Sequence, residues 1–188
     1  MKVVTLNNQA FAAKCTELAE KIPKNIDLIV GVLGGGGYVV DEIRTEFSST
    51  EIRFAEINRE QELKDNVLVR FLLRILPYGV LNTLRVVESK RIKKKLKFIE
   101  SDDLTQHNVS FDTSGLDTTK VKNILIVDDA IDSGSTMIKV KRKMEAHFQD
   151  SKIITAVISW TIHDALLKPD YYLYKNTLVR FPWSKDYK

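Results

Sequence analysis

Apolar runs that alternate with helical patterns limit the folds open to this chain. The run Ile26–Val32 shows little alternation of apolar and polar residues, which is typical of a strand buried on both faces. Further strands are predicted at Ile52–Ile57, Ile124–Val127, Ile153–Trp160 and Leu178–Phe181, and helices at Asn8–Lys21, Tyr38–Phe47 and about Gly134–Phe148. Strands and helices in alternation predict an α/β protein with a mostly parallel sheet and helices on both faces.

Length and composition fit one domain that spans residues 1–188. The N-terminus lacks the long apolar run of a signal peptide, and no apolar run reaches the roughly 18 residues of a membrane helix. Cys15 is the only cysteine, which excludes an internal disulfide and a cysteine-based zinc site and fits a reducing compartment. We therefore expect a cytoplasmic protein without membrane partners, in which Cys15 is a buried helix residue.

The middle of the chain interrupts the alternation of strands and helices. Residues 61–97 show helical spacing on both sides of a Pro-Tyr-Gly break, and they are predicted to form an inserted helical hairpin or cap. Residues 101–120 are polar and aperiodic, and a loop of about 20 residues indicates a functional or flexible segment. The basic stretch Arg85–Lys97 leaves three readings open: a solvated helix face, a field that attracts an anionic substrate, or a surface for an anionic partner. Without a nucleic-acid motif, we do not expect nucleic acid.

The segment Ile124–Met137, with the sequence ILIVDDAIDSGSTM, carries the strongest chemical signal. Asp128 and Asp129 follow the apolar strand, and ligands of open α/β sheets bind at the carboxyl ends of strands. The following turn opens a helix, whose backbone N–H groups and dipole attract an anion. Carboxylates accept hydrogen bonds from sugar hydroxyls, so this segment suits a sugar phosphate.

Three other readings of this segment compete with a sugar-phosphate site. In the first reading, the strand belongs to a nucleotide-binding protein, and one of its acids holds Mg²⁺. Such a protein also needs a G-x-x-x-x-G-K-[ST] loop, but the glycine run at 34–37 lacks the Lys-Ser/Thr pair. In the second reading, the segment belongs to a phospho-acceptor domain, which begins with a strand that ends in two acids. The strand Ile124–Val127, however, lies late in the chain. The third reading is a capped helix after a buried strand, with Asp132 or Ser133 as the N-cap.

The whole segment closely resembles the phosphoribosyl-pyrophosphate (PRPP) loop of type I phosphoribosyltransferases. The resemblance implies a Rossmann-like α/β fold with a helical hood, which corresponds to residues 61–97, and a flexible lid at 101–120. It implies that Asp128 and Asp129 hold the ribose hydroxyls and contact metal indirectly. It also implies that Asp132 assists proton transfer at the base, and that the 5′-phosphate is bound by Ser133, Gly134, Ser135 and Thr136.

A second stretch, LIVGVLGGGGYVVDEI, resembles the pyrophosphate loop of the same family, in which a strand runs into a pair of glycines before a helix. Gly35 and Gly36 take the paired positions, and Gly34 stands where relatives usually carry Lys or Arg. The resemblance assigns Gly34, Gly35 and Gly36 to pyrophosphate. The family often holds a cis peptide here, so we predict one near Leu33–Gly35.

The tail resembles the hypoxanthine, guanine and xanthine branch of the family through KPDYY and the later TLVRFPW. The resemblance assigns Lys168 to the 6-oxo group of a purine, and it aligns Leu178 and Val179 with the residues that contact the base. Leu178 stands where relatives have an aromatic residue. Ser184 stands where relatives commonly carry an acid near magnesium.

The resemblance implies an enzyme that transfers the phosphoribosyl group of PRPP to a nitrogenous, purine-like base and releases pyrophosphate. It implies Mg²⁺ as the cofactor, and PRPP and a nucleobase as small-molecule partners. It also leaves a homodimer possible. Since some proteins with this fold regulate transcription, the alternative is a PRPP-binding regulator with little or no catalysis.

Overall fold

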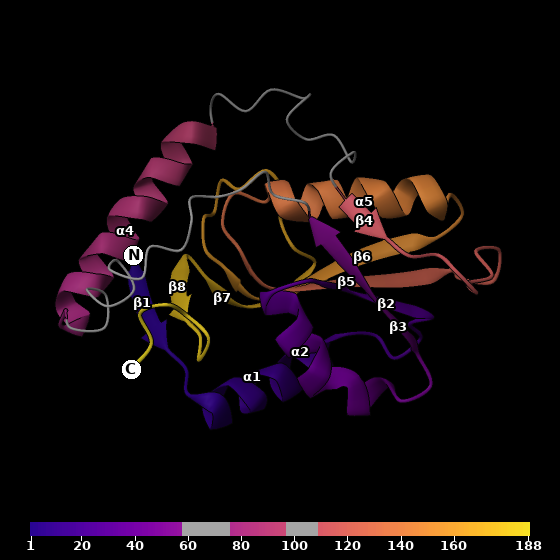
Figure 1. Ribbon diagram of the computed structural model, residues 1–188, viewed down its shortest axis with the longest axis horizontal. Coiled ribbons are helices and arrows are strands. Elements are labelled where there is room, and N and C mark those ends of the chain that lie inside the picture. The colour runs from indigo at the N-terminus through magenta and orange to yellow at the C-terminus, as the bar shows by residue number, and fades with distance from the viewer. Residues whose placement is uncertain (58–75, 97–108) are drawn as a thin grey trace.

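The computed structural model describes residues 1–57, 76–96 and 109–188 (Figure 1). The helices are α1 (Asn8–Lys21), α2 (Gly35–Ile43), a short 3₁₀ helix η1 (Arg44–Phe47), α4 (Tyr78–Lys95) and α5 (Ser135–His147). The strands are β1 (Lys2–Thr5), β2 (Leu28–Val32), β3 (Glu51–Ile57), β4 (Val109–Phe111), β5 (Asn123–Ile131), β6 (Lys152–Trp160), β7 (Tyr171–Lys175) and β8 (Thr177–Arg180). The first predicted helix of the hood and the first part of the predicted loop 101–120 lie outside these ranges.

The main sheet has the strand order β4-β3-β2-β5-β6-β7. All neighbouring strands in it are parallel, except for the antiparallel pair of β3 and β4. The predicted α/β fold with a mostly parallel sheet is therefore confirmed. A second, two-stranded parallel sheet joins β1 near the N-terminus to β8 near the C-terminus.

Helices cover both faces of the main sheet, with α1 and α2 on one face and α5 on the other (Figure 1). Successive residues of a strand point to opposite faces. In β5, Leu125 packs in the core with α1 and α2, whereas Ile126 packs in the core with α5. Both faces of the central strands are therefore apolar, which explains why the sequence of β2 shows little alternation.

Helix α1 has the range that the sequence predicts, and it begins at an N-cap residue. The side chain of Asn7 accepts a hydrogen bond from the backbone N–H of Ala10 at 2.8 Å, which satisfies one of the open donors of the first turn. Cys15 is completely buried on the inner face of α1, as predicted, and burial raises the pKa of its thiol to about 12. Cys15 is therefore a packing residue.

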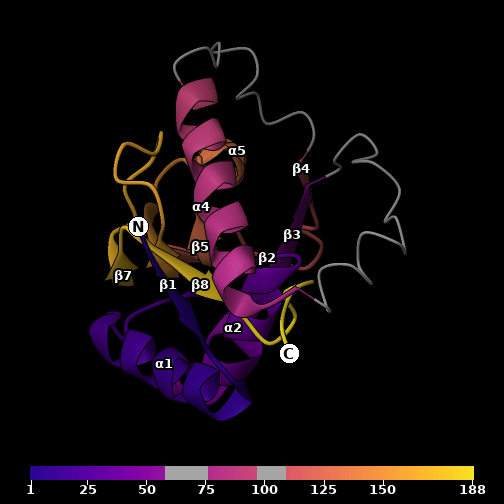
Figure 2. The same ribbon diagram turned by 90° about the vertical axis from the view of Figure 1, so that its left-hand side faces the viewer.

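Helix α4 confirms the second of the two helices predicted within residues 61–97. It stands at one end of the main sheet and crosses in front of β1 and β8 (Figures 1 and 2). None of the helices in the described ranges combines the length and the apolar character that crossing a membrane would require.

Some predicted boundaries were wrong. The range 101–120 contains β4, which pairs with β3 from Val109 to Phe111 and is therefore not loop throughout. Helix α2 begins at Gly35, because the glycines form its first turn. Strand β5 continues to Ile131, since β6 supplies partners along its whole length. The sequence reading also missed β1 and β7, which are short and only partly buried.

Candidate functional site

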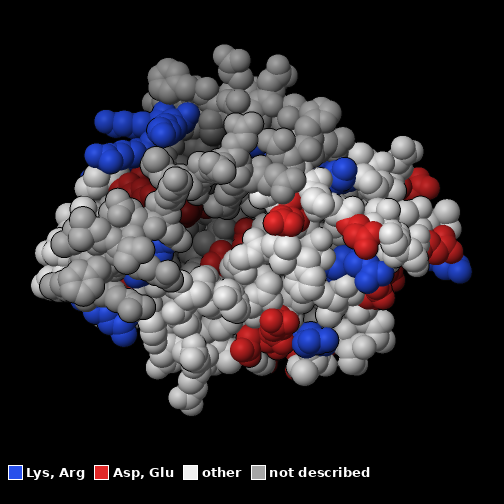
Figure 3. All heavy atoms as spheres, viewed as in Figure 1, with Lys and Arg blue, Asp and Glu red and all other residues white. Residues whose placement is uncertain are grey.

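Strand β5 extends beyond its neighbour β2 at the carboxyl edge of the sheet. Its pairing with β2 ends at Val127, whereas its pairing with β6 continues to Ile131. Asp128 and Asp129 therefore lie where the chain of β2 has already turned away into α2. A cavity of about 960 Å³ opens at this edge, and Asp128 and Asp129 line it together with Asp132. Figure 3 shows acidic side chains inside a hollow of the surface.

The turn between β2 and α2 approaches β5 so closely that side chains are excluded. A methyl group at Gly35 would lie 2.1 Å from the carboxyl carbon of Asp129, and one at Gly36 would lie 2.5 Å from the carbonyl oxygen of Val127. Gly34 has φ 110° and ψ −122°, a conformation that favours glycine. Gly34 and Gly35 line the cavity, whereas Gly36 packs against β5 outside the lining.

The predicted cis peptide near Leu33–Gly35 was wrong. All peptide bonds in the described ranges are trans. The positive φ of Gly34 makes the change of direction between β2 and α2, so a trans chain can complete the turn.

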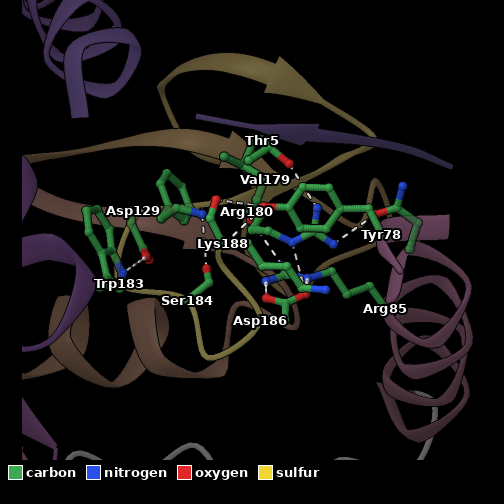
Figure 4. A network of polar contacts seen from close by, with 12 residues as sticks. Thr5, Tyr78, Arg85, Asp129, Val179, Arg180, Trp183, Ser184, Asp186 and Lys188 are labelled. Atoms are coloured by element: carbon green, nitrogen blue, oxygen red, sulfur yellow. Dashed lines mark hydrogen bonds and ion pairs between the residues drawn. The ribbon is translucent and has the colours of Figure 1, made fainter. Parts of the chain in front are cut away.

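Asp129 is a partly buried carboxyl group that reaches towards the C-terminal segment. Its Oδ2 accepts a hydrogen bond from the indole N–H of Trp183 at 3.3 Å (Figure 4). Burial raises the pKa of Asp129 to about 6, and the nearby Asp132 adds to the rise, although hydrogen bonds to the carboxylate oppose it. The backbone N–H of Asp129 donates to Oδ1 of Asp128 at 2.8 Å, which orients the first acid of the pair.

The N-terminus of α5 forms an open cradle beside these acids. Gly134 occupies the N-cap position with φ 85°, and it has no side chain that could cap the helix. The hydroxyl groups of Ser133 and Ser135 lie 2.9 Å apart, and both residues line the cavity with Thr136. The predicted N-cap at Asp132 or Ser133 was wrong, because Gly134 takes that position, although Oγ of Ser133 accepts a hydrogen bond from the backbone N–H of Ser135 at 3.2 Å. A helix N-terminus with open N–H groups and hydroxyls suits an anion.

Two of the three residues that the sequence assigns to the base lie at the cavity. Leu178 and Val179 of β8 line it. Lys168 is exposed in the loop between β6 and β7 and is not among the lining residues. Ser184 also lines the cavity, and its hydroxyl accepts a hydrogen bond from the backbone N–H of Phe181 at 3.0 Å.

Several lining residues were missed by the sequence reading. Three of them are Glu56 at the end of β3, Lys139 in α5 and Thr161 after β6. Two more, Arg85 and Ile92, come from α4. These two are seven residues apart and therefore share a helix face, but only the position of α4 in the fold brings that face to the cavity.

A second cavity of about 450 Å³ lies under α4 and adjoins the first. Its walls come from α4 and from the C-terminal segment. The residues that line both cavities are Arg85, Ile92, Asp132, Leu178 and Ser184.

Asp186 connects α4 to the C-terminal segment through two arginines (Figure 4). It accepts hydrogen bonds from Arg85 of α4 and from Nε of Arg180 at 3.0 Å. Arg180 is 1% exposed, and it also donates to Thr5 of β1 and Asn82 of α4. Burial alone would raise the pKa of Asp186, but the two arginines lower it to about 2.

Comparisons with known proteins agree with this arrangement. A family model described as phosphoribosyl transferase domain matches residues 5–187. A search among curated proteins found no match.

Several solved structures share the fold at low identity. A purine phosphoribosyltransferase from Pyrococcus horikoshii Ot3 is 17% identical with a TM-score of 0.62, covering 98% of this chain and 95% of its own. A xanthine-guanine-hypoxanthine phosphoribosyltransferase from Helicobacter pylori is 14% identical with a TM-score of 0.62, covering 97% and 94%. A hypothetical protein from Neisseria gonorrhoeae with bound ppGpp is 14% identical with a TM-score of 0.58, covering 97% and 89%. At these identities the likeness shows a shared fold.

Proposed function

Because this chain belongs to the phosphoribosyl transferase domain family, we propose that it is an enzyme that moves the 5-phosphoribosyl group from PRPP to a purine-like base and releases pyrophosphate. One observation carries the proposal: a single cavity holds two strand-end acids, the open N-terminus of α5 and the glycine turn before α2. These three elements match the chemistry of a sugar that carries a phosphate at one end and a pyrophosphate at the other.

Each element has a role that its chemistry supports. Asp128 and Asp129 accept hydrogen bonds from the two ribose hydroxyls, because carboxylates accept and do not donate. Ser133–Thr136 bind the 5′-phosphate with hydroxyls and with the backbone N–H groups of the first turn of α5. Gly34 and Gly35 bring backbone N–H groups to the pyrophosphate, since the absence of side chains allows close approach.

The bond change takes place at ribose C1. The lone pair of a ring nitrogen forms the new bond to C1, and the C1–oxygen bond breaks as pyrophosphate leaves with its electron pair. The transition state resembles an oxocarbenium ion, as in glycoside hydrolysis. Asp132 takes the proton that the ring nitrogen loses, because its carboxylate lines both adjoining cavities.

The donor atoms at the site fit Mg²⁺ that arrives with PRPP. Among the residues with a described position, no group of three or more His, Cys, Asp or Glu could hold a metal by itself. Mg²⁺ prefers oxygen donors, and it is often held by one or two carboxylates together with substrate phosphates. Asp128 and Asp129 would supply these carboxylates, directly or through water. When bound, the ion would neutralise the charge on the pyrophosphate.

The acceptor is proposed to be purine-like. The shared fold with purine phosphoribosyltransferases supports this assignment, as do Leu178 and Val179 in the lining of the cavity. The exposed position of Lys168 does not support its assignment to the purine. Residues 61–97 are proposed to form the hood, with α4 as its described part, and the cytoplasmic location and the homodimer stay predictions.

Thermal unfolding with ligands tests the donor half of the proposal. PRPP with Mg²⁺ at about 100 times its Kd is expected to add about 2.7 kcal/mol to the free energy of unfolding. Release of pyrophosphate would then be followed with hypoxanthine, guanine, xanthine and adenine. Stabilisation by PRPP without turnover on any base would favour a PRPP-binding regulator, and no response to PRPP would reject both functions.

Asp132→Asn tests the proposed proton transfer. We expect kcat to fall by about 10²- to 10⁴-fold, because the amide cannot accept the proton. Stabilisation by PRPP is expected to persist, since the other donor-binding residues are unchanged. Unchanged turnover in this variant would remove the role of Asp132.

A further inference from the structure

The junction of the two cavities has a composition suited to a planar base. Ile92 of α4 and Leu178 of β8 contribute apolar surface to both cavities, while Asp132 and Arg85 contribute a carboxylate and a guanidinium. Binding sites for small molecules commonly combine apolar walls with a few oriented polar groups. Because Asp132 lies at this junction, a base that gives its proton to Asp132 also lies within reach of α4.

Arg85 is held in place before any ligand binds. Its Nε and Nη2 donate to the two carboxylate oxygens of Asp186, and its Nη1 donates to the carbonyl oxygen of Val179 at 3.2 Å (Figure 4). Each terminal nitrogen of a guanidinium carries two hydrogens. These contacts therefore leave one hydrogen on Nη1 and one on Nη2 for a ligand, and a fixed side chain loses little entropy on binding.

The cluster of Arg85, Arg180 and Asp186 carries one more positive than negative charge. Asp186 stays ionised because its pKa is lowered to about 2, but it is shared by Arg85 and Arg180. Two cations thus face one carboxylate. Arg180 is buried and lines neither cavity, so the side chain of Arg85, which is 22% exposed, presents the excess charge to a ligand. Such a group attracts the lone pairs of an oxo oxygen and opposes an amino group.

Other described cations do not share this position. Lys139 lines only the first cavity, and Lys185 lines only the second. Lys168 is exposed in the loop between β6 and β7 and lines neither. Within the described ranges, Arg85 is thus the cation that both cavities share.

We propose that Arg85 determines acceptor specificity by donating hydrogen bonds to an oxo group of the base, so that the enzyme selects oxopurines over aminopurines. The inference rests on the proposed function and deepens it. The acceptor is recognised by α4, a helix of the hood, whereas the donor is bound by the ends of the sheet strands and by α5. Asp186 is a positioning residue that orients Arg85.

The test compares product nucleotides, so that it does not depend on turnover. Inosine 5′-monophosphate and adenosine 5′-monophosphate differ in an oxo and an amino group, and calorimetry gives their affinities. The wild type is expected to bind the inosine nucleotide on the order of 10- to 100-fold more tightly than the adenosine nucleotide. This is the affinity difference that one hydrogen bond to a charged group typically supplies. In Arg85→Gln the two affinities are expected to become equal within about threefold, with the affinity for ribose 5-phosphate unchanged.

Lys93→Gln is the matched control. It removes the same charge from the same helix, but Lys93 pairs with Asp164 and lines neither cavity. The preference for the oxo nucleotide is expected to persist in this variant. Arg85→Lys keeps the positive charge but lacks the planar guanidinium group. Its preference for the oxo nucleotide is expected to lie between those of the wild type and Arg85→Gln.

A wild-type measurement tests the inference even where Arg85→Gln fails to fold. Purine riboside 5′-monophosphate lacks the oxo group and is expected to bind at least about tenfold more weakly than the inosine nucleotide. Equal binding of these two ligands, or a preference that survives in Arg85→Gln, would overturn the inference and leave the proposed function intact. Failure of both PRPP and ribose 5-phosphate to bind would overturn the proposed function, and the inference with it.

Discussion

Gly35 and Asp129 share a space that admits only one side chain. A methyl group at Gly35 would overlap the carboxyl group of Asp129. Gly35→Ala is therefore expected to displace Asp129, to cost about 1–3 kcal/mol of stability, as overpacking does, and to weaken PRPP binding. Chemical denaturation and thermal shift with PRPP measure the two effects.

Gly37→Ala supplies the control for Gly35→Ala. Gly37 also lies in α2, but a methyl group there would meet nothing within 4 Å. Since alanine favours helix by up to about 1 kcal/mol over glycine, Gly37→Ala is expected to keep or raise stability. Equal behaviour of the two variants would contradict the proposed packing of Asp129 against the turn.

Titration of Asp129 is expected to make the free energy of unfolding depend on pH. Its pKa is raised to about 6, so the folded protein holds this proton more tightly than the unfolded chain does. The stabilising contribution is fully present below about pH 4 and is lost as the pH rises through about 6. Asp129→Asn cannot ionise, so its stability relative to wild type is expected to increase between these pH values.

Urea denaturation of both proteins from pH 4.5 to 8 measures this difference. Titrating groups far from Asp129 contribute equally in the two proteins and cancel in the comparison, whereas the neighbouring Asp132 also responds to the substitution. A difference in the free energy of unfolding that stays constant with pH would contradict the raised pKa of Asp129.

At the residue scale, the residues proposed to bind the donor could be placed at the cavity from the sequence, whereas Arg85, which we propose contacts the acceptor, could not. Asp128, Asp129 and the cradle Ser133–Thr136 form a continuous segment, so their juxtaposition follows from local structure. Arg85 reaches the cavity only through the packing of α4 against the distant C-terminal segment. A sequence pattern cannot show such a contact. The assignment of Lys168 relied on its neighbours in sequence, although the loop that carries it is exposed.

At the element scale, the strands and helices that build the core were the predictable ones. Helix α1 and strands β2 and β6 bury apolar residues in regular patterns, so their positions follow from the sequence. β4 was missed because three residues carry too short a pattern, and its existence depends on pairing with β3. The sequence also could not give the full length of β5, which depends on its pairing with β6.

The attachment of α4 depends on Asp186. Asp186→Asn would leave Arg85 and the buried Arg180 without their shared counter-charge. Breaking such a buried pair typically costs about 3–5 kcal/mol, and a loss of stability of this size is expected. Urea denaturation measures it.

Asp164→Asn provides a comparison through another ion pair made by the same helix. Asp164 pairs with Lys93 of α4, but both side chains are more than half exposed. Exposed ion pairs contribute little to stability because water and salt screen them, so this variant is expected to stay close to wild type. Losses of equal size in both variants would contradict the view that Asp186 attaches α4.

The whole molecule has a net charge of +4, and α4 carries several of its Lys and Arg residues. Lys and Arg side chains gather over α4 (Figure 3). Replacing Lys90, Arg91, Lys94 and Lys95 by Gln is expected to lower kcat/KM for PRPP on the order of tenfold at low salt, because a positive field speeds association of an anion. Steady-state kinetics as a function of salt measures the effect.

The salt series also separates steering from other effects of these substitutions. At about 1 M salt the screening length falls to about 3 Å, so the difference between the two proteins is expected to disappear. A difference that persists at high salt, or equal kcat/KM at every salt concentration, would indicate that the basic face of α4 is only a solvated surface.

The aromatic stack around Trp183 provides an intrinsic fluorescence probe next to Asp129. Trp183 lies between Tyr38 and Phe181, with ring centroids 4.3 and 5.0 Å away, and it donates its indole N–H to Asp129. The chain has two tryptophans, and neither lines the cavities, but Trp183 is hydrogen-bonded to Asp129, which does. With Trp160→Phe, emission would come from one indole attached to the donor site. Protonation of Asp129, and the proposed binding of PRPP, are therefore expected to change the fluorescence of Trp183 without an attached dye.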